Sequence, residues 1–158
     1  MVPFTNKLEN LRTLTHLDLS FNKIDKCSGL ILDYLHSEGC KLKTFLMNGA
    51  DVDDGECDSL MKAIECNTTI TTLGLSNNLI GKDELLNVIN PDLTTGGEAI
   101  ARMLTINKTL RSLDISWNAI RLNSAEEISR SLASNDTLTR LNLAHNSFAD
   151  MATQLLGK

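Results

Sequence analysis

Aromatic residues are scarce in this chain of 158 residues: one Trp, one Tyr and four Phe make up 4% of the sequence. Leucine occurs 27 times, so the core is expected to consist of aliphatic side chains rather than rings. The hydrophobic share of 42% and the charged share of 22% do not suit a disordered chain. The length fits one domain, and the excess of one apolar residue type favours a repetitive architecture.

An excess of positive charge is also missing. The 15 basic and 20 acidic residues leave a formal charge of −5, which argues against a general nucleic-acid-binding protein. No apolar run approaches the roughly 18 residues of a membrane span, and the N-terminal residues do not resemble a secretory signal. We therefore expect no membrane partner and an intracellular, cytoplasmic location.

Cysteine is present but sparse. Cys27, Cys40, Cys57 and Cys66 form no Cys-x-x-Cys pair and have no nearby histidine that could complete a zinc site. Four cysteines in this length are also too few for a dense disulfide framework. The sequence predicts reduced, mostly buried thiols, with no metal and no cofactor.

The strongest signal is a match of the chain with itself. Five segments carry apolar residues at places one, four, six and eleven, as in Leu110-Arg-Ser-Leu113-Asp-Ile115-Ser-Trp-Asn118-Ala-Ile120. They start at residues 14, 42, 70, 110 and 138, so successive steps are 28, 28, 40 and 28 residues. Between them, residues 56–64 and 125–132 repeat apolar residues every three or four positions, which predicts helices with one buried face.

The pattern L-x-x-L-x-L-x-x-N-x-L resembles a leucine-rich repeat, and a 28-residue unit with a full helix resembles the ribonuclease-inhibitor-like class. The resemblance covers essentially the whole chain. It implies an α/β fold, a right-handed horseshoe segment with a parallel sheet on the concave side and helices on the convex side. Residues 1–13 resemble the end of an upstream repeat, so we expect part of a longer array whose open ends self-associate.

Asparagine recurs at two fixed places. At the ninth place, we expect its amide to bond backbone groups where the chain leaves the strand; Ala50 departs from this pattern. The ninth-place residues are Asn22, Asn78, Asn118 and Asn146. Three Asn-x-Thr sequons begin at Asn67, Asn107 and Asn135, each three residues before a strand segment. Their common position indicates turn chemistry rather than glycosylation.

The 40-residue step contains a 12-residue insertion within 81–96. An apolar cluster of Leu85, Leu86, Val88 and Ile89 lies in it. In a solenoid, an insertion maps to a loop on one rim. Two interpretations remain open: these residues pack on their own repeat, or they form a recognition loop.

No catalytic arrangement is predicted. His16 and His145 fall on the first and last strands, roughly 19 Å apart by strand spacing, and His36 falls in a helical half. The acidic run 51–58 fails as a calcium loop because Ala50 and Val52 occupy ligand places, so it is interpreted as a helix start. We therefore expect no enzyme.

The resemblance implies a protein-interaction scaffold that binds a partner through its concave face or rim; relatives include innate immune, cytoskeletal and ciliary proteins. One family of GTPase-activating proteins uses this repeat, so regulation of a small GTPase is the alternative. The predicted contact residues are Asp114, Trp117, Arg140 and His145, with Leu85 to Ile89 as a second contact. Alternatively, Trp117 and Phe21 pack over the turn of the adjacent unit.

Overall fold

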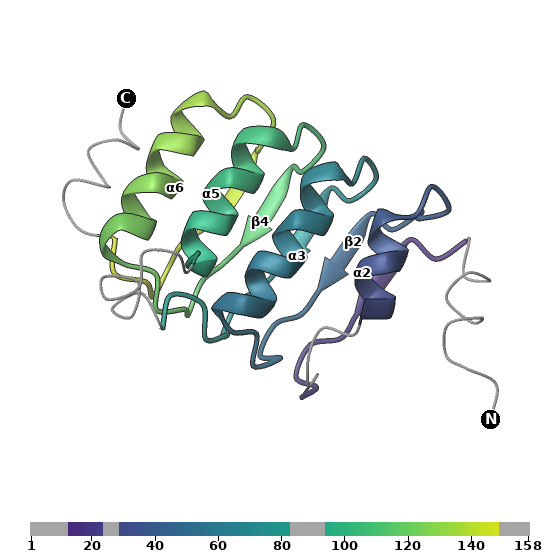
Figure 1. Ribbon diagram of the computed structural model, residues 1–158, viewed down its shortest axis with the longest axis horizontal. Helices are drawn as coiled ribbons and strands as arrows, with labels where there is room; N and C mark the ends of the chain where they lie inside the picture. The colour runs from purple at the N-terminus through teal and green to yellow at the C-terminus, as the bar shows by residue number, and fades with distance from the viewer. Residues whose placement is uncertain (1–12, 24–28, 83–93, 149–158) are drawn as a thin grey trace.

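The computed structural model describes residues 13–23, 29–82 and 94–148. It contains one five-stranded parallel sheet whose strands follow one another in chain order (Figure 1). The strands are β1 (His16–Asp18), β2 (Thr44–Leu46), β3 (Thr72–Gly74), β4 (Ser112–Asp114) and β5 (Arg140–Asn142). Each pair is in register, so equivalent places of successive repeats lie side by side.

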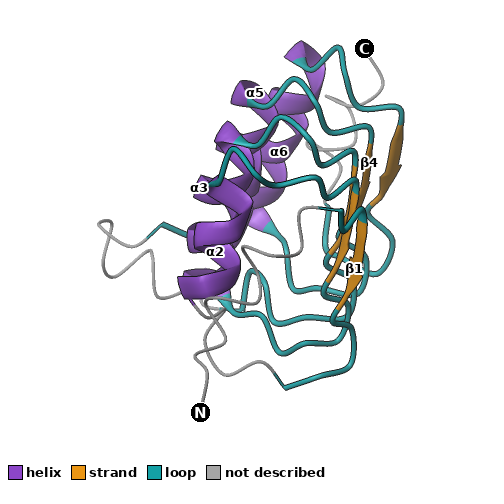
Figure 2. Ribbon diagram, turned by 90° about the vertical axis from the view of Figure 1, so that its right-hand side faces the viewer, coloured by secondary structure: helices purple, strands orange, loops and turns teal. Residues whose placement is uncertain are grey.

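Helices cover one face of the sheet, and Figure 2 shows the two layers edge-on. The described helices are α2 (Gly29–His36), α3 (Asp54–Cys66), α5 (Gly96–Ile106) and α6 (Leu122–Ser134). Their apolar sides meet the fourth- and sixth-place side chains of the strands in one continuous core. This alternation of strand and helix confirms the predicted α/β solenoid.

The ninth-place asparagines join consecutive repeats. The Asn78 amide nitrogen donates to the carbonyls of Met47 (2.8 Å) and Leu75 (2.9 Å), one in each repeat. Its oxygen accepts from the backbone N–H groups of Ala50 (2.9 Å) and Val52 (3.1 Å). The next two repeats are linked in the same way by Asn118 and Asn146.

The exception at Ala50 has its consequence one repeat earlier. The turn at Ala50 is satisfied by the following repeat, through Asn78. What is missing is the bond that an asparagine at this place would make to the first repeat. Among the described residues, the Asn22 amide nitrogen donates to the carbonyls of Leu19 and Ser20 of its own turn.

A second asparagine ladder closes the helix-to-strand turns. The Asn107 oxygen accepts from the N–H groups of Thr109 and Leu110, both at 2.8 Å, and its nitrogen donates to Ile64 of the preceding repeat (2.7 Å). Asn67 and Asn135 make equivalent bonds. Asn67 and Asn107 are only 5% and 3% exposed, so these sequons serve the turns.

The acidic run begins a helix, as the sequence indicates. Asp53 is the N-cap of α3 and forms a reciprocal capping box with Glu56. The neighbouring Asp54 is buried, and its Oδ1 accepts from the backbone N–H groups of Gly81 (2.8 Å) and Gly96 (2.6 Å). One carboxylate oxygen therefore fixes both ends of the insertion, whose apolar cluster lies outside the described residues.

The cysteines in the described ranges are free, with Cys40 and Cys57 buried and Cys66 exposed, while Cys27 lies outside those ranges. Burial, followed by the carboxylates of Asp54 and Asp58, raises the pKa of the Cys57 thiol far above its ordinary value. Its thiolate, the reactive form, is therefore suppressed.

These burial differences predict selective thiol reactivity. In a Cys27→Ser background, we expect Ellman's reagent at about pH 8 to modify Cys66 rapidly while the protein is folded. Cys40 and Cys57 should react at that rate only after denaturation in urea. Rapid modification of either buried thiol in the folded protein would contradict the described packing.

Candidate functional site

The eighth place of each repeat, where the chain leaves the strand, forms a row along one edge of the sheet. We call these five residues the exit row: Phe21, Gly49, Asn77, Trp117 and His145. All have left-handed backbone conformations, with φ between 53° and 59°. Glycine and asparagine tolerate this region well, whereas bulky side chains rarely occupy it.

The backbone, not the side chain, imposes this conformation. The N–H groups of the first four exit-row residues each donate to the seventh-place carbonyl of the next repeat, for example Trp117 to Ala144 at 2.8 Å. The same bond joins Phe21 to Asn48 (2.7 Å). The left-handed turn thus extends the inter-repeat ladder one step beyond the strand, whatever side chain the place carries.

Two of the predicted contact residues form an aromatic pair. The rings of Trp117 and His145 are stacked, with centroids 3.6 Å apart and an interplanar angle of 17°. Trp117 nevertheless remains 57% exposed. Packing on the adjacent unit and presentation to a partner are therefore both compatible with its position.

The other two predicted contact residues differ in role. Asp114 Oδ1 accepts from the N–H (2.9 Å) and hydroxyl (2.7 Å) of Ser116, and its Oδ2 accepts from Asn142 (3.1 Å). This carboxylate thus supports the turn that carries Trp117. Arg140 is exposed at the start of β5, and its guanidinium makes no hydrogen bond or ion pair within the described residues.

Phe21 shares the features of Trp117 at the other end of the exit row. It is 78% exposed, and its ring lies against the neighbouring glycine: a Cβ on Gly49 would be 2.7 Å from Phe21 Cδ1. Gly49 therefore leaves space for the Phe21 ring. The sequence signal for this exposed aromatic was its eighth place, which it shares with Trp117.

The stacked pair can be tested by a double-mutant cycle. We expect Trp117→Ala and His145→Ala to show a coupling free energy of about 1 kcal/mol, because each substitution removes the same ring contact. Urea unfolding should be followed by circular dichroism, since the only Trp is lost in one variant. Additive effects of the two substitutions would indicate that the rings do not interact in solution.

The histidines do not form a common site. His16 and His145 lie in β1 and beyond β5, the two edge strands, and His36 ends α2 on the other face. Among the residues the structure describes, no three His, Cys, Asp or Glu side chains are grouped as a metal site requires. In the same ranges, no helix has the length and hydropathy to cross a membrane.

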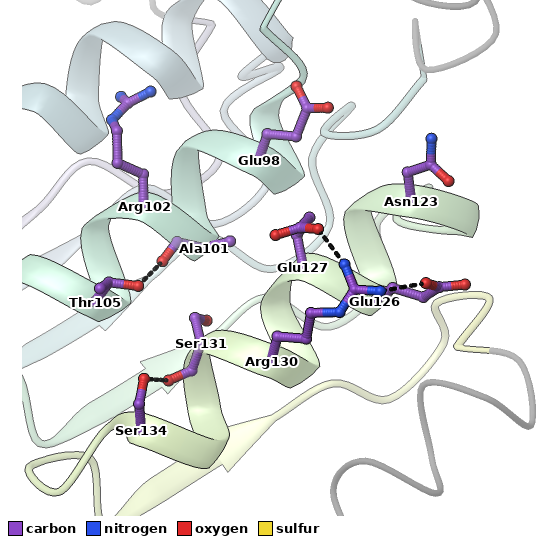
Figure 3. Close-up of a pocket in the computed structure, with 10 residues that line it drawn as sticks. All are labelled: Glu98, Ala101, Arg102, Thr105, Asn123, Glu126, Glu127, Arg130, Ser131 and Ser134. Atoms are coloured by element: carbon purple, nitrogen blue, oxygen red, sulfur yellow. Dashed lines mark hydrogen bonds and ion pairs between the residues drawn. The ribbon is translucent and has the colours of Figure 1, made fainter.

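A polar hollow of about 720 Å³ lies between α5 and α6 on the helical face, a feature that the sequence did not predict (Figure 3). Arg130 lies beside it and pairs with Glu126 (3.2 Å) and Glu127 (2.5 Å) of its own helix. Arg102 instead reaches α3, where it pairs with Glu65 at 2.6 Å. The arginines of the hollow are thus already engaged by carboxylates.

Comparison with known proteins is consistent with the repeat. The leucine-rich repeat family model matches residues 10–26, 107–129 and 134–150. The chain is similar to NACHT, LRR and PYD domains-containing protein 4C of Mus musculus, with 26% identity over 97% of this chain but 14% of that protein. Protein 13 of the same name from Homo sapiens is 27% identical over 94% of this chain and 13% of its own length. The chain therefore spans only a small part of these relatives.

Two solved structures share the fold. A leiomodin-1 structure described as actin-binding site 2 has a TM-score of 0.71 and 22% identity, covering 97% of this chain and 85% of that one. The tropomodulin C-terminal domain of Caenorhabditis elegans has a TM-score of 0.64 and 13% identity, covering 98% and 90%. The ribonuclease-inhibitor-like class stays a prediction from the 28-residue period. Five leucine-patterned strands in one parallel sheet and three matches to the family model show that the chain contains leucine-rich repeats.

Proposed function

We propose that this chain is a non-enzymatic protein-interaction module that binds its partner at the exit row of the fourth and fifth repeats. The observation that carries the proposal is the Trp117–His145 stack, an aromatic pair that remains exposed. Tryptophan is enriched among the few residues that dominate binding energy at protein interfaces. A stacked ring also loses little conformational freedom when a partner binds.

Arg140 supplies the charged part of the proposed contact. Because its guanidinium is exposed and unpaired within the described residues, it can donate two parallel hydrogen bonds to a carboxylate of the partner. Asp114 acts as a positioning residue, through its bonds to Ser116 below the Trp117 turn. The apolar cluster Leu85–Ile89 is proposed as a second contact, since both ends of its insertion are fixed by Asp54.

The relatives suggest which partners to test. Since the leiomodin domain with this fold is described as an actin-binding site, purified actin is one defined probe. The cytoplasm, including cytoskeletal structures, is the proposed setting. Regulation of a small GTPase is the alternative function, and a stimulation assay with purified GTPases separates it from simple binding.

The test is a binding assay with the immobilised chain, using purified actin and, separately, cell lysate with mass spectrometry. We expect Trp117→Ala to reduce the retained partner at least tenfold, since truncation of a central anchor typically costs about 2 kcal/mol or more. Ile106→Ala is the matched control, because Ile106 is a 50% exposed apolar residue at the end of α5. Equal retention by the wild type and Trp117→Ala would refute the placement at the exit row.

The insertion is tested separately by replacing residues 83–93 with a short Gly-Ser linker. This replacement keeps Thr95, which caps α5, and Gly96, which bonds Asp54. Binding that falls only in this variant would move the site to the insertion.

Self-association through the outer edges of β1 and β5 is also proposed, and sedimentation analysis over a range of concentrations tests it.

A further inference from the structure

We propose that the exit row binds an extended peptide segment of the partner, anchored by two apolar side chains four residues apart, one at Phe21 and one at Trp117. This inference rests on the proposed function and deepens it, because it names the form of the partner and adds Phe21 to the site. Four observations carry it: backbone conformation, exposure, spacing and charge.

The first two observations are the backbone conformation and the exposure of the aromatic residues in the exit row. Its left-handed turn favours glycine or asparagine, the residues found at Gly49 and Asn77. Phe21 and Trp117 occupy the same conformation, with φ of 58° and 53°, and remain 78% and 57% exposed. Neither aromatic is placed there for burial in the core. Bulky side chains held in an unfavourable conformation at an exposed place indicate a role outside folding.

Spacing determines the form of the ligand. Phe21 and Trp117 belong to the first and fourth repeats, three strand steps apart, or about 14 Å at 4.8 Å per step. In an extended segment, residues i and i+4 face the same side and lie about 13–14 Å apart. In a helix, residues on one face recur at i+7, i+8 and i+11, about 10.5 Å, 12 Å and 16.5 Å apart. The extended form fits both anchors.

The centre of the exit row accommodates the rest of such a segment. Between the aromatic anchors lie Gly49, against which the Phe21 ring packs, and Asn77, whose side chain is short and polar. Two exposed aspartates, Asp18 and Asp51, stand within three residues of exit-row residues in the sequence. Hydrogen bonds from Ser20 keep the pKa of Asp18 below its ordinary value, so this group remains charged. Basic residues between the two apolar anchors are therefore favoured.

The test uses a displayed library of random nine-residue peptides, selected on the wild-type chain and then measured as synthetic peptides. We expect enriched peptides to share two apolar residues at i and i+4. Phe21→Asn and Trp117→Asn should each weaken their binding at least tenfold, while Ile106→Asn should not. Asparagine is chosen because Asn77 shows that it suits this turn.

Stability provides the second readout. If the aromatics serve binding, Phe21→Asn should leave the urea midpoint unchanged or raise it, since asparagine relieves the strained turn. A lowered midpoint together with unchanged peptide binding would overturn the proposal. So would a selection that yields no peptide, or peptides without the i, i+4 spacing. Binding that depends on Trp117 but not on Phe21 would overturn the two-anchor proposal alone, whereas independence from Trp117 would refute the proposed function as well.

Discussion

Replacement of Asn78 by alanine should lower the free energy of unfolding by about 3 kcal/mol. The substitution removes both acceptor bonds to the N–H groups of Ala50 and Val52, which lie in the interior of the array. Each unsatisfied buried N–H costs about 1–3 kcal/mol. The carbonyls of Met47 and Leu75 lose a donor as well. Urea unfolding followed by circular dichroism measures the change.

Asn22→Ala is the matched control, because Asn22 occupies the same place in the first repeat. Within the described ranges, its amide nitrogen donates to the carbonyls of Leu19 and Ser20 of its own turn, in an exposed position. We expect a loss below about 1 kcal/mol. If the two substitutions cost the same, the bonds between repeats would contribute nothing beyond those within a turn.

A methyl group on Gly97 should be comparably destabilising. Gly97 lies at the start of α5, where a Cβ would come within 2.3 Å of Ser124 Cβ and 3.3 Å of Ser124 Cα. The second atom is backbone, so a rotamer change alone cannot relieve the contact, and α5 must move away from α6. The buried hydrogen bond between Ser124 and Thr95 (2.8 Å) would be disturbed too. We expect Gly97→Ala to cost about 3 kcal/mol.

Gly29→Ala is the control for this substitution. Gly29 also begins a helix, α2, but nothing lies within 4 Å of its Cβ position. Alanine should leave the free energy of unfolding unchanged or raise it by about 0.4–1 kcal/mol, because it lowers the conformational entropy of the unfolded chain. A Gly97→Ala variant as stable as the wild type would show that α5 and α6 are not packed as closely as described.

Much of the fold could be predicted from the sequence because each repeat has the same spacing of apolar residues. Leucines at places four and six predict which side of each strand is buried, and Leu73 and Leu113 are indeed 1% exposed. The step of 28 residues sets equivalent places side by side without a register shift. Once the period is known, strand order and the position of the helices follow from stacking.

Interactions that do not repeat were beyond such reasoning. Asp54 occurs once, in an acidic run whose other members cap or flank α3, and its bonds to Gly81 and Gly96 depend on the insertion. Likewise, Asn48 stands where three of the other four repeats carry serine, and its oxygen accepts from both the N–H and the hydroxyl of Ser76. The repeat pattern describes only what the repeats share, so it predicts neither of these contacts.

The candidate site was predictable only in part. Strand alternation identified the residues that face away from the helices, and the eighth place identified Trp117 and His145 as neighbours. The sequence pattern could not show that the Asp114 carboxylate accepts hydrogen bonds from Ser116 and Asn142, because those bonds depend on side-chain rotamers. Nor could it show the left-handed backbone that gives Phe21 and Trp117 their common exposure.

The most direct test of binding at the exit row is an amide chemical-shift map of the 15N-labelled chain, titrated with a selected synthetic peptide. We expect the largest shifts at residues 20–22, 48–50, 76–78, 116–118 and 144–146, the turns that carry the exit row. Amides of α5 and α6 around the polar hollow should change little. Shifts centred on that hollow, with the exit row unaffected, would contradict the assignment and place the binding surface on the helices.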